Sequence, residues 1–222
     1  MISVVSFDLD GTLTTSSFAD AVWLDGLPRL YAETSGKDLE AAKRELFAEY
    51  DRISDQRLEW YDPAYWFDHY HLPGDWRSLL HQNRSHIACF PDVPVVLPRL
   101  AAQYQLVINS NAKREFIDIE LQELHLRDCF THIFSSTSDF HTVKKVREFY
   151  AMICQRLNVT PSQIVHVGDS KRFDYDAPRA AGITAYFLDR TGKEHGPYVV
   201  HTLLEFEDKL VKNRISHKTS AD

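Results

Sequence analysis

Short runs rich in β-branched residues alternate along the chain with segments whose apolar residues recur at helical spacing. The alternation predicts strands at residues 2–7, 105–109, 132–136, 163–167 and 183–187, and helices at 93–104, 113–126, 144–158 and 176–182. Strands that alternate with helices are typical of a parallel sheet whose two faces are covered by helices. We therefore predict an α/β fold in three layers.

The pattern changes between residues 16 and 88, where no β-rich run occurs. Four segments there have helical spacing, at 18–33, 38–53, 65–71 and 75–82, and Gly36 and Asp38 are suited to end one helix and to cap the next. An insertion directly after the first strand lies over the carboxyl ends of the strands, where open α/β sheets bind ligands. We predict a core of residues 1–15 and 89–212, a helical cap of residues 16–88 and a flexible tail of residues 213–222.

Composition narrows the class of protein. The 222 residues carry a formal net charge of −7, which argues against a nucleic-acid-binding protein but is compatible with a small anionic substrate. Cys89, Cys129 and Cys154 lack the spacing of a disulfide framework or a zinc site. Because no signal-peptide pattern or membrane-length apolar run occurs, we expect a cytoplasmic protein that does not bind membranes, either a monomer or a homodimer.

Polar residues gather just past the predicted strands. They are Asp8, Asp10, Ser110, Asn111, Asp169 and Asp174, with Lys144 and Lys145 near the fourth helix. Taken singly, each has an ordinary explanation as a turn, cap or surface residue. Together they would meet at one sheet edge, where crowded carboxylates favour a cation and an all-oxygen set suits Mg²⁺. Hydroxyl, backbone N–H and lysine groups hold phosphate oxygens, and an aspartate can attack phosphorus, so the set indicates phosphoryl transfer.

Four segments resemble the signature motifs of the haloacid dehalogenase (HAD) superfamily of hydrolases. They are "DLDGTLT" at the first strand, "VINSNA" at the second, Lys144 six residues before Tyr150, and "VGDSKRFDYDAPRAAG" near the fourth. The resemblance spans residues 2 to about 188. It implies a Rossmann-like core with a cap of the C1 type and a Mg²⁺-dependent phosphatase acting on a small phosphorylated metabolite.

The resemblance also implies roles for individual residues. Asp8 corresponds to the nucleophile, which forms an aspartyl phosphate, and Asp10 to the general acid and then base. Mg²⁺ would be held by Asp8, the backbone carbonyl of Asp10 and Asp169. The phosphate would be held by Ser110, Asn111 and Lys144, with Asp174 supporting Lys144 or a metal-bound water and Thr12 shaping the first loop.

The chain departs from the family pattern at two positions. The lysine of the third motif is usually followed by proline, but Lys144 is followed by Lys145, so either lysine could enter the site. We favour Lys144 because of its spacing to Tyr150. The segment "TTSSF" after "DGTL" lacks an acidic residue that is more common there, which removes one indication of a phosphoglycolate phosphatase.

Three other functions stay open at this level. A metal-independent 2-haloacid dehalogenase is disfavoured by Asp10, because a departing halide needs no proton whereas an ester oxygen does. A phosphomutase would use the same nucleophile. A phospho-accepting signalling domain, which is not an enzyme, is disfavoured by the long insertion and by the position of the Asp pair after the first strand.

The predicted cap contains an aromatic-rich stretch, residues 57–71. We expect most of it to form the core of the cap. The alternative is that part of it, with Trp60 or Trp66, faces the site and receives an apolar or ring-bearing leaving group. Arg52, Arg57 and Arg84 are possible contacts for an acidic substrate, and His69 and His71 lack metal spacing. We expect the hinges of the cap at Ser16, Ser17, Pro91 and Asp92.

Overall fold

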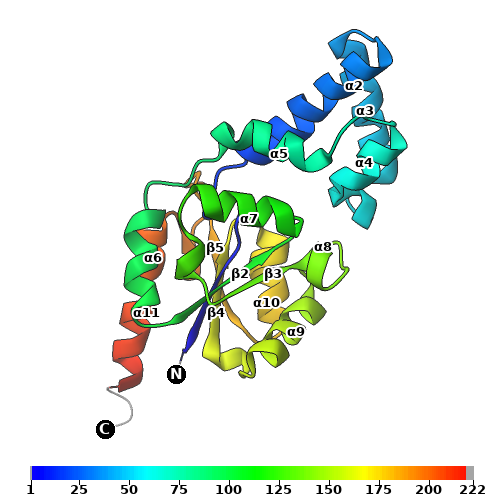
Figure 1. The fold of residues 1–222 in the computed structure, drawn as a ribbon. Helices are drawn as coiled ribbons and strands as arrows, with labels where there is room; N and C mark the ends of the chain where they lie inside the picture. Colours follow the sequence, from blue (N-terminus) through cyan, green and yellow to red (C-terminus); the bar gives the residue numbers. More distant parts are fainter. Residues whose placement is uncertain (1, 219–222) are drawn as a thin grey trace.

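The computed structural model describes residues 2–218 (Figure 1), and its centre is a six-stranded, fully parallel sheet. The strand order is β3-β2-β1-β4-β5-β6. The strands are β1 (Val4–Phe7), β2 (Gln105–Ser110), β3 (His132–Ser135), β4 (Ile164–Gly168), β5 (Thr184–Leu188) and β6 (Val199–Val200). The predicted α/β class is confirmed, and five strands lie where the pattern placed them. The two-residue strand β6 was missed because so short a run has no measurable alternation.

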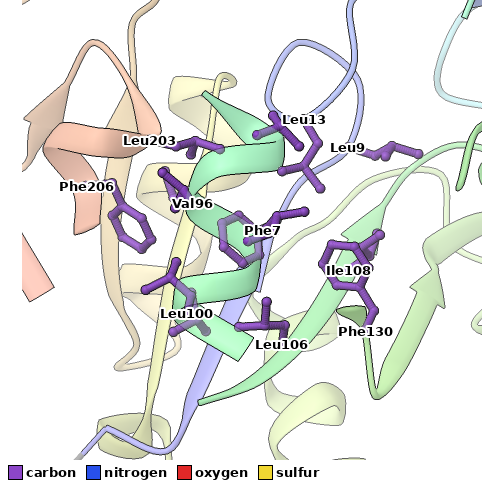
Figure 2. Close-up of a cluster of buried hydrophobic side chains, with 14 of the residues drawn as sticks. Phe7, Leu9, Leu13, Val96, Leu100, Leu106, Ile108, Phe130, Leu203 and Phe206 are labelled. Carbon is purple, nitrogen blue, oxygen red and sulfur yellow. The ribbon is translucent and has the colours of Figure 1, made fainter. Parts of the chain in front are cut away.

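Helices cover both faces of the sheet. On one face, α6 (Val93–Ala101), α7 (Arg114–Glu123) and α11 (Leu203–Lys218) pack in one cluster with Val5 and Phe7. On the other, α9 (Arg147–Leu157) and α10 (Ala177–Ala180) pack against a cluster that includes Val4. Figure 2 shows Phe7 among the side chains of the first cluster, where its ring meets that of Phe206 edge-on at 6.1 Å. Successive residues of β1 thus face opposite layers, as the pleat requires.

The register of the sheet aligns the carboxyl ends of the central strands. Phe7 of β1 pairs with Ile108 of β2 and Val167 of β4. The residues that follow these three positions therefore leave the sheet at the same level and on the same edge. This is the edge at which polar side chains were expected to converge.

A helical insertion (residues 17–86) follows β1 and has its own hydrophobic cluster. Its elements are α1 (Ser17–Asp20), η1 (Ala21–Gly26), α2 (Leu27–Ser35), α3 (Leu39–Ile53), η2 (Leu58–Tyr61), α4 (Pro63–His69), α5 (Trp76–Asn83) and η3 (Arg84–His86). Trp66 is fully buried in this cluster, and Phe116 of α7 joins it from the core. Figure 1 shows α2–α5 standing beyond the end of the sheet near α7.

The helix ends confirm two local predictions and revise two others. Gly36 ends α2 with a left-handed φ of 69°, and the Asp38 side chain accepts from Ala41 N at 2.9 Å. Helix α9 begins at Arg147, so Lys144 and Lys145 precede it rather than open it. Helix α11 continues to Lys218, because "NRISHK" contains no glycine or proline to interrupt it. The predicted tail is thus helical up to that residue, and residues 219–222 lie outside the described part of the chain.

The remaining short helices lie in the loops of the core. They are η4 (Arg127–Cys129), α8 (Ser136–Asp139), η5 (Pro161–Gln163) and η6 (Lys171–Asp176). Of these, η6 follows β4 directly and so lies at the sheet edge described above.

The two segments that join the helical insertion to the sheet are hydrogen-bonded to each other. Thr15 N donates to Ala88 O at 2.9 Å, and Phe90 N donates to Leu13 O at 3.1 Å. Thr14 and Cys89 form an antiparallel bridge between them. A hinge at Ser16, Ser17, Pro91 and Asp92 stays a prediction, although buried Asp92 is tied to Arg190 by an ion pair of 3.1 Å.

The cap of α3 provides a test of this local reading. Replacing Asp38 with Ala should lower the free energy of unfolding by about 1 kcal/mol, because the N–H of Ala41 loses its acceptor at the helix start. Asp38→Asn, which keeps an acceptor oxygen, should stay within a few tenths of a kcal/mol of the parent. Urea unfolding monitored by circular dichroism measures both. Equal losses from the two variants would show that the charge, rather than the cap, stabilises α3.

Candidate active site

The first loop places Asp8 where three strands end. Asp8 follows β1, and its N–H donates to Val167 O of β4 at 3.0 Å. Thr12 Oγ1 donates to Asp8 Oδ2 at 3.1 Å and accepts from the N–H of Asp169 at 3.2 Å. The Thr12 hydroxyl therefore joins the loop after β1 to the loop after β4 and fixes one carboxylate oxygen of Asp8.

Gly11 allows these two loops to approach. It has φ +83°, a conformation that side chains with a β-carbon rarely adopt, and a β-carbon there would collide with the carboxylate of Asp169. Its N–H donates to Thr14 O at 2.7 Å, which closes the turn. The glycine after the Asp pair thus brings Asp169 next to the first loop.

The structure places Lys145, rather than Lys144, in the carboxylate cluster. Lys145 Nζ donates to Asp8 Oδ1, to Asp174 Oδ1 at 2.5 Å and to the Asn109 carbonyl at 3.2 Å. Lys144 Nζ instead contacts Asp55 of the helical insertion at 2.7 Å. The sequence-based preference for Lys144 therefore does not match the positions of the two side chains. The preference rested on the spacing to Tyr150, but both lysines precede α9, and outside a helix the spacing does not determine where a side chain points.

A buried network of hydrogen bonds from residues of the sheet supports Asp174. Asn109 Nδ2 donates to Ser6 Oγ at 2.6 Å, so the Ser6 hydroxyl donates to His166 Nδ1 at 2.8 Å, and His166 Nε2 can donate to Asp174 Oδ1 at 3.1 Å. Burial lowers the pKa of His166, which fits the neutral ring that this chain of bonds requires. Sequence analysis did not identify Ser6 or His166, although both are polar residues inside buried strands.

Tyr150 and Ser170 complete the support of Asp174. The Tyr150 hydroxyl donates to Phe173 O at 2.8 Å and lies 3.1 Å from His166 Nε2. Ser170 N donates to Asp174 Oδ2 at 3.0 Å. Both oxygens of Asp174 are thus occupied by protein groups. A supporting role for Asp174 stays a prediction, and the lysine that it contacts is Lys145 rather than Lys144.

The charges in the cluster shift one another's pKa values. Burial, together with the charge of Asp174, raises the pKa of Asp8 to about 6 despite the opposing effect of Lys145. Burial alone would raise the pKa of Asp174 too, but Lys145 and His166 lower it to about 2. Burial alone would lower the pKa of Lys145, yet the two carboxylates raise it. Lys145 is therefore charged and paired with Asp174, and of the two carboxylates that it contacts Asp8 is the one whose pKa is raised.

Asp10 is a second carboxyl with a shifted pKa. Its Oδ1 is buried and has no hydrogen-bond partner among the described residues, and burial and the Asp8 charge raise its pKa to about 7. Buried Glu120 of α7 faces the same loop, and burial and the charge of Asp10 raise its pKa well above its usual range. Glu120 was not singled out from the sequence, where it is one position of the helix predicted at 113–126.

Ser110 and Asn111 lie at the end of β2, as predicted. Ser110 Oγ accepts from Ala112 N at 3.0 Å, so its O–H remains available to donate. Asn111 Oδ1 accepts from Ser136 Oγ at 3.0 Å and from Lys145 N at 3.1 Å, which fixes the backbone that carries the site lysine. Helix α7 begins only at Arg114, so the segment from residue 111 to 113 is a loop and not the first turn of the helix.

The acidic cluster fits a hard divalent cation. One carboxylate oxygen from each of Asp8, Asp169 and Asp174 lies within 4.8 Å of the others. Desolvation and the charges of Asp8 and Asp174 raise the pKa of Asp169 to about 7, although part of this residue reaches solvent. Asp174 accepts from Lys145, His166 and Ser170, whereas each oxygen of Asp8 accepts from a single group. Asp8 and Asp169 are therefore the carboxylates with more capacity for a metal. An all-oxygen set of this kind suits Mg²⁺ better than softer metals.

Arg190, which follows β5, was missed by sequence analysis. Its guanidinium binds both carboxylate oxygens of buried Asp92 at 3.1 Å and donates to Thr12 O at 2.7 Å. Asp92 also accepts from Leu203 N at 2.7 Å. Arg190 and Asp92 together therefore tie the first loop to the start of α6 and to α11. The available signal was its position just past a strand, at the edge where the other polar residues gather.

A pocket of about 280 Å³ opens between Asp10 and the helical insertion. Trp60 and Tyr61 line it, whereas Trp66 is buried inside the insertion and does not reach it. His69 packs face to face with Tyr65, with 5.4 Å between the ring centroids. The aromatic stretch thus serves both purposes considered, core and pocket wall.

The family model of haloacid dehalogenase-like hydrolases matches residues 2–182, which is most of the chain. The chain belongs to the haloacid dehalogenase-like hydrolases. This agrees with the resemblance seen in the four motifs. Comparison with curated proteins gives no match.

Solved structures similar to this HAD-like hydrolase share its fold over nearly their whole length. A HAD phosphatase from Thermococcus onnurineus has a TM-score of 0.82 at 24% identity, covering 95% of this chain and 98% of that one. A 2-haloacid dehalogenase from Pseudomonas syringae pv. tomato has a TM-score of 0.68 at 22% identity, covering 96% and 99%. The HAD-hydrolase YfnB from Bacillus subtilis, bound to magnesium, has a TM-score of 0.64 at 20% identity, covering 92% and 96%.

Two further observations concern the class of protein. None of the helices between residues 2 and 218 combines the length and the apolar character needed to cross a bilayer. Cys89, Cys129 and Cys154 are free thiols, as their spacing predicted.

The two adjacent lysines of this HAD-like hydrolase should differ sharply in their contribution to stability. Lys145→Met would leave buried Asp8 and Asp174 without their cation and should lower the free energy of unfolding by about 3–5 kcal/mol. Lys144→Met removes a pair whose partner Asp55 is half exposed, so we expect a loss of about 1 kcal/mol or less. Denaturant titration of both variants at pH 7 measures the difference. A larger loss from Lys144→Met would contradict the placement of the two side chains.

Proposed function

We propose that this HAD-like hydrolase is a Mg²⁺-dependent phosphatase that hydrolyses a small phosphate monoester through an aspartyl phosphate on Asp8. The observation that carries the proposal is Asp10: a carboxyl group with a buried, unpartnered oxygen and a pKa raised to about 7, lining the pocket beside Asp8. A group of this kind can hold a proton at neutral pH and deliver it to an ester oxygen. Cleavage of a carbon–halogen bond has no use for it.

In the first step, an oxygen of Asp8 attacks phosphorus and the bond from phosphorus to the ester oxygen breaks. Thr12 holds Asp8 Oδ2 and Lys145 holds Asp8 Oδ1, so the carboxylate is oriented before substrate binds. Asp10 gives its proton to the leaving oxygen, and the alcohol departs. Asp8, Asp169 and the Asp10 carbonyl would hold the cation, which would neutralise negative charge on the phosphoryl oxygens.

In the second step, ionised Asp10 takes a proton from water as the water oxygen attacks phosphorus. The bond between phosphorus and the Asp8 oxygen breaks, which releases phosphate and returns Asp8 and Asp10 to their starting states. Ser110 has a free O–H to donate to a phosphoryl oxygen, and Lys145 lies beside Asp8 with its charge retained. We assign to Lys145 the phosphate contact that the sequence had suggested for Lys144, together with Ser110 and Asn111.

Two related activities would use the same core. A phosphomutase would return the phosphoryl group to a second hydroxyl of its substrate instead of to water. A 2-haloacid dehalogenase would displace halide with Asp8 and would need neither Asp10 nor a metal. Similar folds include a dehalogenase as well as a phosphatase, so the experiments below separate these activities.

The acid role of Asp10 predicts a dependence on the leaving group. Asp10→Asn should reduce kcat/KM for an alkyl phosphate such as benzyl phosphate by about a hundredfold or more. The loss for 4-nitrophenyl phosphate should be several times smaller, because nitrophenolate leaves without a proton. Asp8→Asn should abolish both activities, and Asp176→Asn, the same change at an exposed site, should alter neither. Equal losses on the two substrates from Asp10→Asn would remove the acid role and leave Asp10 a structural residue.

The raised pKa values predict how Mg²⁺ and protons compete. Asp8, Asp10 and Asp169 have folded pKa values of about 6, 7 and 7, above their usual value near 4. The stability they contribute is complete below pH 4 and is lost as pH rises through 6–7. Bound Mg²⁺ should offset this loss, so the increase in Tm on adding Mg²⁺ should be larger at pH 8 than at pH 5.

Differential scanning calorimetry with Mg²⁺ or chelator at each pH measures this increment, and Asp169→Asn should diminish it. Asp174, with a pKa of about 2, does not titrate in this range. Phosphate release should also stop in chelator. Halide release from 2-chloropropionate that persists in chelator, without phosphatase activity, would establish the dehalogenase instead.

A further inference from the structure

The pocket beside Asp10 is walled mainly by aromatic rings. Trp23, Tyr50, Trp60 and Tyr61 come from the helical insertion, and Phe116 comes from α7. The rings of Trp23 and Phe116 are stacked at 5.7 Å with an angle of 6° between their planes, and Trp60 stacks on Trp23 at 6.4 Å. These contacts fix one another, so the wall is a preformed apolar surface.

The hydroxyl groups of the two tyrosines are turned to the backbone. The Tyr50 hydroxyl donates to Trp23 O at 3.1 Å, and the Tyr61 hydroxyl donates to Asp55 O at 3.3 Å. A sugar hydroxyl placed against these rings would therefore lose water without gaining either tyrosine O–H as a donor. The wall selects against a leaving group rich in hydroxyls.

The charges at the pocket select against a second anion. Among the described residues that line it, Lys113 is the cation, and its ammonium is paired with Asp62 and lies over the ring of Trp76. The carboxylate of Asp20 also lines the pocket, whereas Asp10 is neutral while it holds the proton that the acid step requires. Because Lys113 is already paired, no cationic side chain in the pocket wall is left for a carboxylate or second phosphate.

The arginines considered from sequence do not change this balance. Arg52 pairs with Glu49, and Arg57 pairs with Glu59 at 2.6 Å. Neither these two nor Arg84 lines the pocket. The sequence-based hypothesis that they bind an acidic substrate therefore receives no support from the structure.

From this we infer that the substrate is the phosphate monoester of a ring-sized, apolar alcohol that carries no second negative charge. The inference rests on the proposed phosphatase function and defines its leaving group. The size agrees, since a cavity of roughly 150 Å³ holds benzene and this pocket has about 280 Å³, which leaves room for the phosphoryl group. Trp60 of the insertion and Phe116 of α7 both line the space that the ring would occupy.

Three esters of primary alcohols test the inference in the presence of Mg²⁺: benzyl phosphate, 4-carboxybenzyl phosphate and glucose 6-phosphate. Because all three leave as primary alcohols, their ratios of kcat/KM report recognition. We expect benzyl phosphate to exceed each of the other two by about tenfold or more. Glucose 6-phosphate or 4-carboxybenzyl phosphate used as efficiently as benzyl phosphate would overturn the inference.

A charge reversal at the pocket sharpens the test. Asp20→Lys should reduce the preference for benzyl over 4-carboxybenzyl phosphate by about fivefold, and Asp20→Asn should reduce it by less. Asp51→Lys makes the same charge change at an exposed position of α3 outside the pocket wall and should leave the ratio unchanged. Equal effects of Asp20→Lys and Asp51→Lys would overturn the assignment of the pocket.

Acetyl phosphate separates failure of the inference from failure of the proposed function. Its acyl group is too small to fill the pocket, so its hydrolysis reports the core chemistry alone. Hydrolysis of acetyl phosphate without preference for benzyl phosphate would overturn the inference and leave the phosphatase intact. If neither acetyl phosphate nor any ester released phosphate, the proposed function itself would fail.

Discussion

The buried ammonium of Lys145 is the interaction on which the rest of the site depends. Asp8, Asp174 and Asp169 lie close together at the end of a parallel sheet, and without a cation their repulsion would force one or more to take up a proton. The positive charge of Lys145 stabilises the ionised form of Asp174 fully and that of Asp8 only in part. The remaining negative charge is what a divalent metal would neutralise. Lys145 thus lets the carboxylates stay together and still leaves them able to bind a cation.

The aspartates of the site are chemically identical, but their different surroundings give them different pKa values. Asp174 is enclosed by hydrogen-bond donors and is permanently ionised, while Asp8 keeps an intermediate pKa. Asp10 is not one of the groups that Lys145 contacts directly. It faces an apolar pocket and holds its proton near neutral pH. Four aspartates on two loops could therefore act as support, nucleophile, acid and metal ligand.

Much of the fold and the site could be predicted from the sequence, because the signals were local. The β-branched runs gave the strand positions, and the polar residues just past them marked the edge where Asp8, Ser110 and Asp169 meet. Choosing between Lys144 and Lys145 could not succeed in this way. The two precede α9 in an irregular segment, so their directions depend on tertiary partners, Asp55 for one and Asp8 for the other. Arg190 and His166 were missed for a similar reason, since Arg190 pairs with Asp92 and His166 with Ser6, both distant in sequence.

The contacts between the helical insertion and the core have a consequence for how firmly the two are joined. Besides the aromatic contact through Phe116, they include ion pairs between Lys144 and Asp55, between Lys113 and Asp62, and between Arg77 and Glu115. The carboxylate partner in each pair is partly open to solvent, so dissolved salt weakens these attractions. Ionic strength would therefore act on the enclosure of the pocket while leaving the Lys145 cluster, which is shielded from water, largely unaffected.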